Sequence, residues 1–379
     1  MGSSSRFHLY AVIIFLACLD LRGGCCGRIL RADKLRKAAL FVFGDSLYDA
    51  GNNNYINTTT DFQANFWPYG ESFFKHPTGR FSNGRLIPDF IAEYAKLPLI
   101  PAYLKPGEHQ FEYGANFASG GAGALDETHP GLVINLKTQL SYFKNVEKML
   151  RQKLGTKDTK QLLHNAVYLF SIGGNDYLSP IGSNSSIYYS FSQAEYVEMV
   201  IGNLTTVIKE IYKDGGRKFG FVGSIPYGYL PAIRLLIPRN TSGESIEEVT
   251  NLAKLHSKAL AKTLQKLQAQ LKGFKYSNFH FYSSFMERID NPSNYGFKEG
   301  KVACCGSGRL RGVYSCGGKR GVKNYQLCNN ASEYFFFDSY HATEMAYQQF
   351  AELMWSGTPN ITGPHNLKSL FESSGFCLG

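Results

Sequence analysis

The stretch Ala-Leu-Phe-Val-Phe-Gly-Asp-Ser, residues 39–46, joins an uninterrupted apolar run to a polar turn. A short apolar run without polar alternation is typical of a strand that is covered on both faces, as the strands of parallel sheets are. Gly44 permits a tight turn directly after this run. Because reactive side chains of parallel sheets sit where strands end, we expect Asp45 and Ser46 at the carboxyl edge of a sheet.

Four further runs have the same strand-like character, at 113–118, 166–172, 218–223 and 278–283. Long stretches of helical periodicity alternate with them. Two of these helices open at capping boxes, Ser192-Gln-Ala-Glu195 and Ser245-Ile-Glu-Glu248, and two others are expected at 136–154 and about 343–355. The alternation predicts an α/β fold in which a parallel sheet of about five strands is flanked by helices on both faces.

The N-terminal segment is typical of a secretory signal peptide. Its apolar run, Leu9 to Cys18, is ten residues long, which is too short for a membrane span of about 20 residues. Small residues follow, and the basic segment 28–37 argues against an anchored helix. We therefore expect residues 1–26 to be removed and residues 27–379 to form one domain of a secreted protein, extracellular or alternatively vacuolar.

Cysteines and glycosylation sequons agree with an oxidising compartment. Cys304, Cys305, Cys316 and Cys328 cluster in a glycine-rich segment, and adjacent cysteines make a poor zinc chelate. Two disulfides that staple a loop around 300–330 are therefore expected, with three pairings open. Six N-x-S/T sequons are candidate glycosylation sites: Asn57, Asn184, Asn203, Asn240, Asn330 and Asn360.

Composition and charge restrict the functional classes. Apolar residues make up 44% and charged residues 18% of the chain, which excludes a disordered protein. The net charge is +10, but the basic residues are mostly spread out and no nucleic-acid-binding motif occurs, so no nucleic acid partner is expected. A basic loop is interpreted as a solvated surface, with contact to a cell wall or a membrane surface as the alternative; it contains Lys298, Lys301, Arg309, Arg311, Lys319, Arg320 and Lys323.

Ser46 has one well-matched candidate base. A serine after a strand is most often a helix N-cap, but a nucleophilic serine needs an imidazole whose other nitrogen has an acceptor. Asp338 and His341 are three residues apart before the last helix, so one turn can bring them together. His256 lies on an apolar helix face, where a core histidine is the simpler interpretation. Ser46, His341 and Asp338 are thus the candidate nucleophile, base and orienting carboxylate.

Two other strand ends carry candidate donors for an oxyanion. Asn175 follows the third strand in Gly173-Gly174-Asn175-Asp176, and Gly120 follows the second strand in a glycine-rich turn. These glycines also fit ordinary turns and helix packing. Neither segment has the spacing of a nucleotide-binding loop.

Several blocks of the chain resemble those of the plant GDSL esterases/lipases of the SGNH hydrolase superfamily. They cover essentially residues 39–355, and two further short segments are similar to the secreted, defence-associated subgroup: Phe297–Gly300 and Ala303–Gly308. The main blocks are Phe43–Asn52, Pro77–Arg85, Asn116–Gly123, Gly173–Asp176 and Asp338-x-x-His341. The resemblance implies a flavodoxin-like three-layer sandwich.

The resemblance also implies roles for the candidate residues. Ser46 would be the nucleophile, His341 the base and Asp338 its partner, with Asn175, the Ser46 amide and a glycine as the oxyanion hole. Gly120 is the expected glycine and Gly70 its competitor. One departure is visible, because the family usually has proline after the histidine and this chain has Ala342, which loosens one constraint on His341.

Three functions follow from this interpretation. The first is a secreted hydrolase that cleaves small-molecule or lipid esters through an acyl-enzyme, with no cofactor and no metal. The second is an acyltransferase that passes the acyl group to an alcohol or amine. The third is an inactive, secreted lipid- or wall-binding protein. Nothing in the sequence indicates the natural ester, its acyl length or the oligomeric state.

Overall fold

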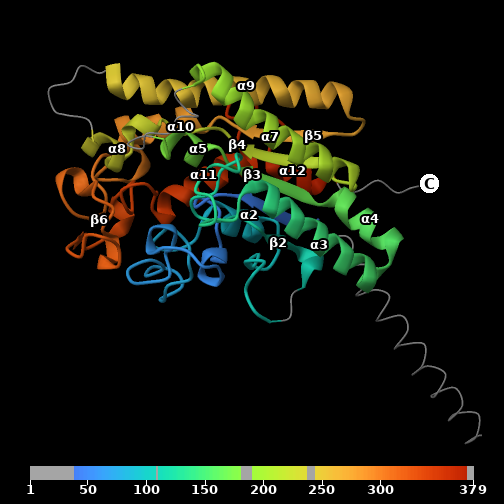
Figure 1. Ribbon diagram of the computed structural model, residues 1–379, viewed down its shortest axis with the longest axis horizontal. Coiled ribbons are helices and arrows are strands. Elements are labelled where there is room, and N and C mark those ends of the chain that lie inside the picture. Colours follow the sequence, from blue (N-terminus) through green and yellow to red (C-terminus); the bar gives the residue numbers. More distant parts are fainter. Residues whose placement is uncertain (1–37, 108–109, 181–189, 237–243, 374–379) are drawn as a thin grey trace, which may run out of the picture.

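A computed structural model describes residues 38–107, 110–180, 190–236 and 244–373, with the main chain alone for 244–249 (Figure 1). The expected signal peptide, residues 1–26, lies outside the described residues, as do the sequons Asn184 and Asn240 and the isolated Cys377. None of the helices in the described ranges is long and apolar enough to cross a bilayer.

The centre of the molecule is a six-stranded sheet, which confirms the α/β prediction. Its strand order is β2-β1-β3-β4-β5-β8, with the first five parallel and β8 antiparallel to β5. The strands are β1 (Leu40–Gly44), β2 (Gly114–Asn116), β3 (Val167–Ser171), β4 (Lys218–Val222), β5 (Lys275–Phe279) and β8 (Thr362–Pro364). The short edge strand β8 was not predicted, since three residues that end in proline carry no strand signal.

The prediction for the fifth strand was wrong by several residues. β5 is Lys275–Phe279, and the helix α10 (Phe281–Asp290) begins two residues later. The strand contains Ser277 and Asn278, which are buried but polar, whereas the aromatic residues that suggested a strand lie at its end and in α10. Apolar character alone therefore placed the strand too far along the chain.

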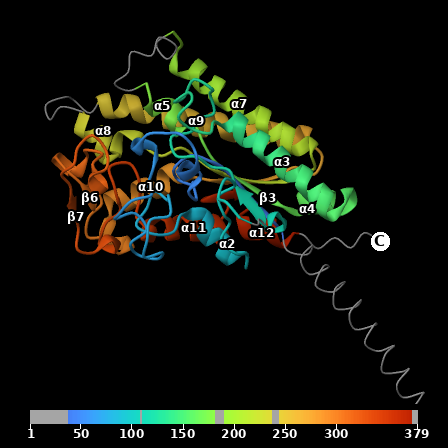
Figure 2. The same cartoon turned by 60° about the horizontal axis from the view of Figure 1, so that its bottom comes forward.

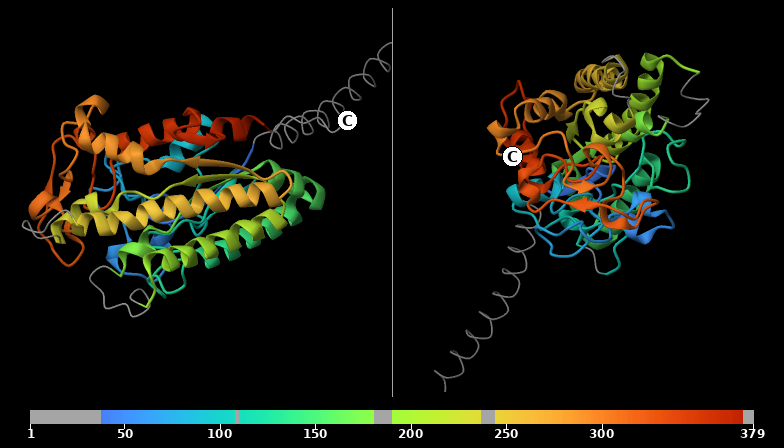
Figure 3. Two further views of the ribbon diagram at one scale, coloured as in Figure 1. Left: turned by 90° about the horizontal axis from the view of Figure 1, so that it is seen from above. Right: turned by 90° about the vertical axis from the view of Figure 1, so that its left-hand side faces the viewer.

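Two layers of helices cover the sheet, as Figure 3 shows in its left-hand view. One layer contains α3 (Leu136–Leu154), α4 (Thr156–Asn165), α7 (Gln193–Lys213) and α9 (Glu244–Gln270). The other contains α2 (Ile87–Tyr94), α10, α11 (Glu344–Ser356) and α12 (Leu367–Glu372). Two short helices, α5 (Gly174–Leu178) and α8 (Pro231–Leu236), lie beyond the carboxyl ends of β3 and β4. Helices on both faces explain why the strands are apolar without alternation.

One of the two predicted capping boxes is present. The Ser192 hydroxyl accepts from the Glu195 amide over 3.3 Å, and the Glu195 carboxylate accepts from the Ser192 amide over 2.9 Å. The second prediction was wrong, because α9 begins at Glu244 and Ser245 therefore lies inside its first turn rather than at its cap.

Aromatic side chains fix the register of the central strands. Phe43 on β1 stacks on Phe170 of β3 with ring centroids 4.8 Å apart, and Phe170 lies 5.4 Å from Phe221 of β4. Such cross-strand pairs contribute about 0.5–1.5 kcal/mol each beyond the area they bury. They hold the strand ends, and hence the loops that follow, at fixed positions relative to one another.

The cysteine-rich segment forms the predicted stapled loop. Cys304 pairs with Cys328 and Cys305 with Cys316, which selects one of the three pairings that the sequence left open. The loop contains β6 (Cys305–Gly306) and β7 (Gln326–Leu327) and lies against the N-terminal segment that follows β1, as Figure 2 shows. Tyr69, Phe81 and Phe337 pack with its cysteines in a second, smaller core.

Candidate active site

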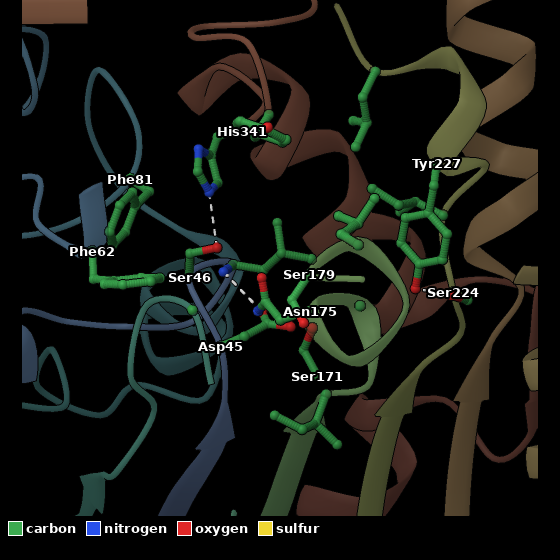
Figure 4. A pocket seen from close by; sticks show the side chains of 18 of the residues that line it. Asp45, Ser46, Phe62, Phe81, Ser171, Asn175, Ser179, Ser224, Tyr227 and His341 are labelled. Atoms are coloured by element: carbon green, nitrogen blue, oxygen red, sulfur yellow. Dashed lines mark hydrogen bonds between the residues drawn. The ribbon is translucent and has the colours of Figure 1, made fainter. Parts of the chain in front are cut away.

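The loops after β1, β2 and β3 meet at one edge of the sheet. β1 lies between β2 and β3. The chain passes from β1 to β2 on one side and then crosses to β3 on the other side of β1, so the strand order reverses direction at β1. Such a switch in strand order opens a crevice at the carboxyl ends of parallel strands. Ser46 follows β1 and Asn175 follows β3, so both stand beside this crevice (Figure 4).

Ser46 is presented by a turn that Gln139 of α3 clamps. The Gln139 side chain accepts from the Gly44 amide over 2.9 Å and donates to the Gly44 carbonyl over 2.8 Å. Ser46 itself is half-buried, and its Oγ lies 2.8 Å from His341 Nε2. The hydroxyl therefore contacts an imidazole, which is the arrangement expected of a nucleophile.

Asp338 and His341 meet within one turn, as their spacing suggested. His341 donates from Nδ1 to both carboxylate oxygens of Asp338, over 2.8 and 2.9 Å. Asp338 Oδ1 also accepts from the main-chain amides of Tyr340 and His341. With Nδ1 protonated, Nε2 is free to accept the Ser46 proton. The structure thus brings all three predicted residues into one chain of hydrogen bonds.

The main chain around His341 is held despite the absence of proline at position 342. The His341 carbonyl accepts from the Phe337 amide over 2.8 Å, and the Thr343 amide donates to the Phe335 carbonyl over 2.9 Å. Ala342 is buried between these two bonds. Main-chain pairing therefore supplies a constraint of the kind that proline would give.

Asp338 is fully buried, and its surroundings favour the ionised form. Burial opposes ionisation, but the charge of His341, hydrogen bonds from His341 and Tyr69, and the charge of Arg320 outweigh it. Together they hold the pKa of Asp338 below its usual range. No sequence motif pointed to Tyr69 or Arg320 as partners of Asp338. Arg320 was expected on a solvated loop, and that prediction was wrong, because its side chain is buried.

Asn175 is placed to donate into the crevice. It lies in the first turn of α5, lines the cavity and is half-buried. Its Nδ2 donates one hydrogen to the Ala122 carbonyl over 3.0 Å, which fixes the amide and leaves a second hydrogen available. This geometry agrees with the expected location of an oxyanion donor.

The structure argues against both glycines considered for the oxyanion hole. The Gly120 amide donates to the buried Asp49 carboxylate over 2.9 Å, and the Gly70 amide donates to the Ser82 carbonyl over 3.0 Å. Gly121 lines the cavity instead, and its amide has no hydrogen-bond partner among the described residues. Asp49 captures the Gly120 amide, and this contact decides which amide of the turn is left to face the cavity.

A cavity of about 350 Å³ surrounds Ser46 and His341. Phe62 and Phe81 lie on one side of Ser46 in Figure 4, and Tyr227 and Ser224 lie on the other. Further apolar side chains line the wall, namely Ile172, Leu178, Val222, Ile225 and Leu230. The cavity therefore combines apolar walls with about as much polar surface around Ser46 and His341.

Two other histidines near the site have different surroundings. His256 is buried, its Nδ1 lies 2.9 Å from the Tyr177 hydroxyl, and burial lowers its pKa to about 4, as expected of a neutral core histidine. His129, in the loop after β2, lines the cavity. Its Nδ1 donates to the Gly121 carbonyl over 2.8 Å, which holds the peptide that joins Gly121 to Ala122 in place.

Three buried aspartates support the loops of the site. Asp49 accepts from the amides of Gly51, Asn52 and Gly120, and Asp176 accepts from two amides and the Thr128 hydroxyl. Burial raises the pKa of each to about 6 despite these hydrogen bonds. Asp45 accepts from the Leu47 amide over 3.1 Å, and burial together with nearby Asp176 raises its pKa to about 7.

Four of the predicted sequons fall on described residues, and all four asparagines are exposed: Asn57, Asn203, Asn330 and Asn360. In the part of the chain that the structure describes, no group of three histidine, cysteine, aspartate or glutamate side chains could hold a metal ion.

Comparison with known proteins adds independent findings. Residues 40–354 match the family model described as GDSL-like Lipase/Acylhydrolase. The chain is 56% identical over 339 residues to GDSL esterase/lipase 1 of Arabidopsis thaliana, which covers 89% of this chain and 90% of that protein. It is 52% identical over 372 residues to a GDSL lipase of Tanacetum cinerariifolium, covering 98% and 96% of the two chains.

A more distant relative has a different name. The chain is 37% identical over 335 residues to the inactive GDSL esterase/lipase-like protein 25 of Arabidopsis thaliana, over 87% of this chain and 74% of that protein. Overall similarity therefore extends to a protein described as inactive. Whether this chain is catalytic has to be judged from the residues of its own site.

Proposed function

Because the chain belongs to the GDSL-like lipase/acylhydrolase family, we propose that it is a secreted carboxylic-ester hydrolase with Ser46 as its nucleophile. One observation carries this proposal. The Ser46 hydroxyl, the His341 imidazole and the Asp338 carboxylate form a continuous chain of hydrogen bonds of 2.8–2.9 Å. That chain ends in a cavity with both apolar and polar walls that is large enough for a small organic group.

Acylation begins when the Ser46 Oγ attacks the ester carbonyl carbon and His341 Nε2 takes the hydroxyl proton. The carbonyl π electrons move to oxygen, and the oxyanion accepts hydrogen bonds from the amides of Ser46 and Gly121 and from Asn175 Nδ2. Collapse of this intermediate breaks the bond to the alkoxy oxygen, which receives the proton from His341. The products are a free alcohol and an acyl group bound to Ser46.

Deacylation repeats the sequence with water. His341 Nε2 removes a proton from a water molecule as it attacks the acyl carbon, and then returns that proton to the Ser46 oxygen as the carboxylic acid leaves. Asp338 remains a carboxylate throughout, orients the imidazole through Nδ1 and stabilises the imidazolium that forms twice per cycle. No group outside this chain is needed for these steps.

The lining of the cavity supports a proposal for the substrate class. Its aliphatic wall and its aromatic side suit an apolar acyl or aryl group on each side of the reacting carbon. We propose small-molecule or lipid esters of this kind as substrates. A series of p-nitrophenyl esters with acyl chains of increasing length measures the fit of the acyl group directly.

The decisive experiment replaces the nucleophile. Ser46→Ala is expected to abolish turnover of p-nitrophenyl esters and labelling by a fluorophosphonate probe while the protein stays folded. Ser283→Ala is the matched control, because this exposed serine donates to the His280 carbonyl and is not among the residues that line the cavity. Unchanged turnover in Ser46→Ala would refute the proposal, and a wild-type protein that neither turns over nor labels would favour the inactive alternative.

Product analysis separates hydrolysis from acyl transfer. The wild-type protein is incubated with an ester and with an added alcohol or amine, and the products are identified by mass spectrometry. Free acid as the sole acyl product supports the hydrolase. A new ester or amide that forms only with Ser46 present would instead assign the acyltransferase.

We propose secretion on the strength of two features of the mature chain. The two disulfides are of a kind that persists in oxidising compartments. The four described sequon asparagines are exposed and accessible to glycan transfer. N-terminal sequencing of the protein from its native tissue should begin near residue 27, and enzymatic removal of N-glycans should lower its apparent mass.

A further inference from the structure

Arg320 is a buried cation in the stapled loop. Its side chain is 2% exposed. Nη1 donates to the Cys316 carbonyl over 3.1 Å, and Nη2 donates to the Gln63 carbonyl over 2.8 Å and to the Tyr314 hydroxyl over 3.0 Å. The guanidinium also lies 3.7 Å from the centre of the Tyr314 ring. Contacts from two segments, at residue 63 and at residues 314–316, therefore fix its position.

The charge of Arg320 has no direct partner. No carboxylate lies within ion-pair distance of it among the described residues, and its Nε is buried without an acceptor. A buried cation is costly unless an opposite charge compensates it. The carboxylate of Asp338 is the anion next to this cation, and the two are linked through the hydroxyl of Tyr69.

Tyr69 accepts a hydrogen bond from the cation and donates one to the anion. Arg320 Nη1 donates to the Tyr69 oxygen over 3.2 Å, and Tyr69 donates to Asp338 Oδ2 over 2.6 Å. Because a guanidinium has donors and no acceptor, the phenolic hydrogen cannot point toward Arg320. Arg320 thus aims the Tyr69 hydroxyl at Asp338.

We propose that Tyr69 and Arg320 are positioning residues of the catalytic centre, which hold the Asp338 carboxylate ionised and oriented toward His341. This inference rests on the proposed function, since it assigns the two side chains a role through the Asp338–His341 pair. It also gives the stapled loop a catalytic purpose, because the Cys305–Cys316 disulfide closes the segment whose Cys316 carbonyl holds Arg320.

The proposal predicts a direction for pH dependence. The Arg320 cation and the Tyr69 hydrogen bond both help to hold the pKa of Asp338 low. Removal of either contribution lets Asp338 take up a proton at higher pH. The acid limb of the kcat/KM profile should therefore move upward. Tyr314, Tyr340 and Tyr347 also lie near Asp338 and are neutral in this range. Two carboxylates of the cavity, Asp45 and Asp61, are the same in every variant, so only differences between variants report on Tyr69 and Arg320.

The experiment compares four variants with the wild type. Tyr69→Phe and Arg320→Gln remove the two contributions. Arg311→Gln is the control for Arg320, since Arg311 lies in the same loop but donates to the carbonyls of Ala303 and Cys304. Tyr295→Phe is the control for Tyr69, since Tyr295 also donates to a carboxylate, that of the exposed Glu287. The readouts are kcat and kcat/KM for a p-nitrophenyl ester from pH 5 to pH 8, and the thermal midpoint.

Tyr69→Phe and Arg320→Gln should each move the acid limb upward by about one pH unit and lower kcat at neutral pH by about tenfold. Both controls should keep the wild-type profile even where the thermal midpoint falls. If Arg320→Gln does not fold, Tyr69→Phe decides alone, and an unmoved profile in it overturns the inference. A shift of equal size in the controls would also overturn it.

The same measurements separate this inference from the proposed function. If Ser46→Ala loses turnover but the pH profiles of Tyr69→Phe and Arg320→Gln do not move, the positioning roles are overturned and the proposed function stands. Turnover that survives Ser46→Ala overturns both, because the pair that Tyr69 and Arg320 support would then have no serine to act on.

Discussion

Gly44, the last residue of β1, pairs in register with Ser171, the last residue of β3. A Cβ at position 44 would collide with the main-chain oxygen of Ser171. That oxygen accepts instead from the Asp45 amide over 3.1 Å. The segments that carry Ser46 and Asn175 therefore leave the sheet side by side because residue 44 has no side chain.

Gly44→Ala should damage both stability and catalysis. The added methyl group must push β1 away from β3 or distort the turn, which we expect to cost about 2–4 kcal/mol of unfolding free energy. Displacement of Ser46 by a fraction of an ångström should lower kcat by about a hundredfold. Urea unfolding and ester turnover measure the two effects.

Gly202→Ala is the matched control for that substitution. Gly202 lies inside α7, and a Cβ there meets no atom within 4 Å. Alanine in an exposed helix interior is expected to stabilise the protein by about 0.5–1 kcal/mol without changing turnover. A wild-type kcat in Gly44→Ala would contradict the importance of the β1–β3 contact.

Asn175→Ala tests the oxyanion donor. The substitution removes an amide hydrogen from the position where charge develops, so kcat should fall by about 10²- to 10³-fold while KM changes little. Ester kinetics at saturating and limiting substrate separate the two parameters. A variant that raised KM alone would show that Asn175 binds the substrate rather than stabilising the intermediate.

The sequence predicted those parts of the site that local spacing or sheet topology determines. Asp338 and His341 are three residues apart, so a single turn suffices to join them. Ser46 and Asn175 follow parallel strands, whose carboxyl ends share one edge of the sheet. In both cases the prediction needed no detail of side-chain packing.

The remaining features depend on tertiary contacts. In the Gly120–Gly121 turn, the peptide available to a ligand is decided by Asp49, which captures the Gly120 amide from a distant loop. Arg320 lies in a glycine-rich, basic stretch that is typical of a solvated loop. It is buried because the Cys305–Cys316 disulfide and the ring of Tyr314 hold the loop against the site.

The two disulfides should contribute differently to activity. Replacement of Cys305 and Cys316 by alanine removes the crosslink between two residues that are 11 apart in the sequence. This should lower the free energy of unfolding by about 2–3 kcal/mol. Activity should fall as well, since the Cys316 carbonyl helps to hold Arg320. The Cys304–Cys328 double variant opens a 24-residue separation and should lose stability with a smaller loss of turnover per folded molecule.

Thermal unfolding and active-site titration with a fluorophosphonate probe distinguish these outcomes. The titration counts folded, reactive molecules, so turnover can be expressed per competent site. Equal losses of turnover per site in both double variants would contradict a specific role for the Cys305–Cys316 disulfide.

Asp45→Asn should remove the part of the pH dependence of unfolding free energy that the Asp45 carboxyl contributes. In the folded protein burial raises the pKa of Asp45 to about 7, against 3.8 for the ordinary carboxyl. Between these values the folded state keeps a proton that the unfolded chain releases, so the stability contributed by Asp45 is present at low pH and is lost as pH rises toward 7. Asparagine is neutral at every pH. Relative to the wild type, the variant should therefore gain about 2–3 kcal/mol between pH 5 and pH 8. Urea unfolding at the two pH values measures this gain, and a difference that stays constant would show that Asp45 is already ionised in the folded protein at pH 5.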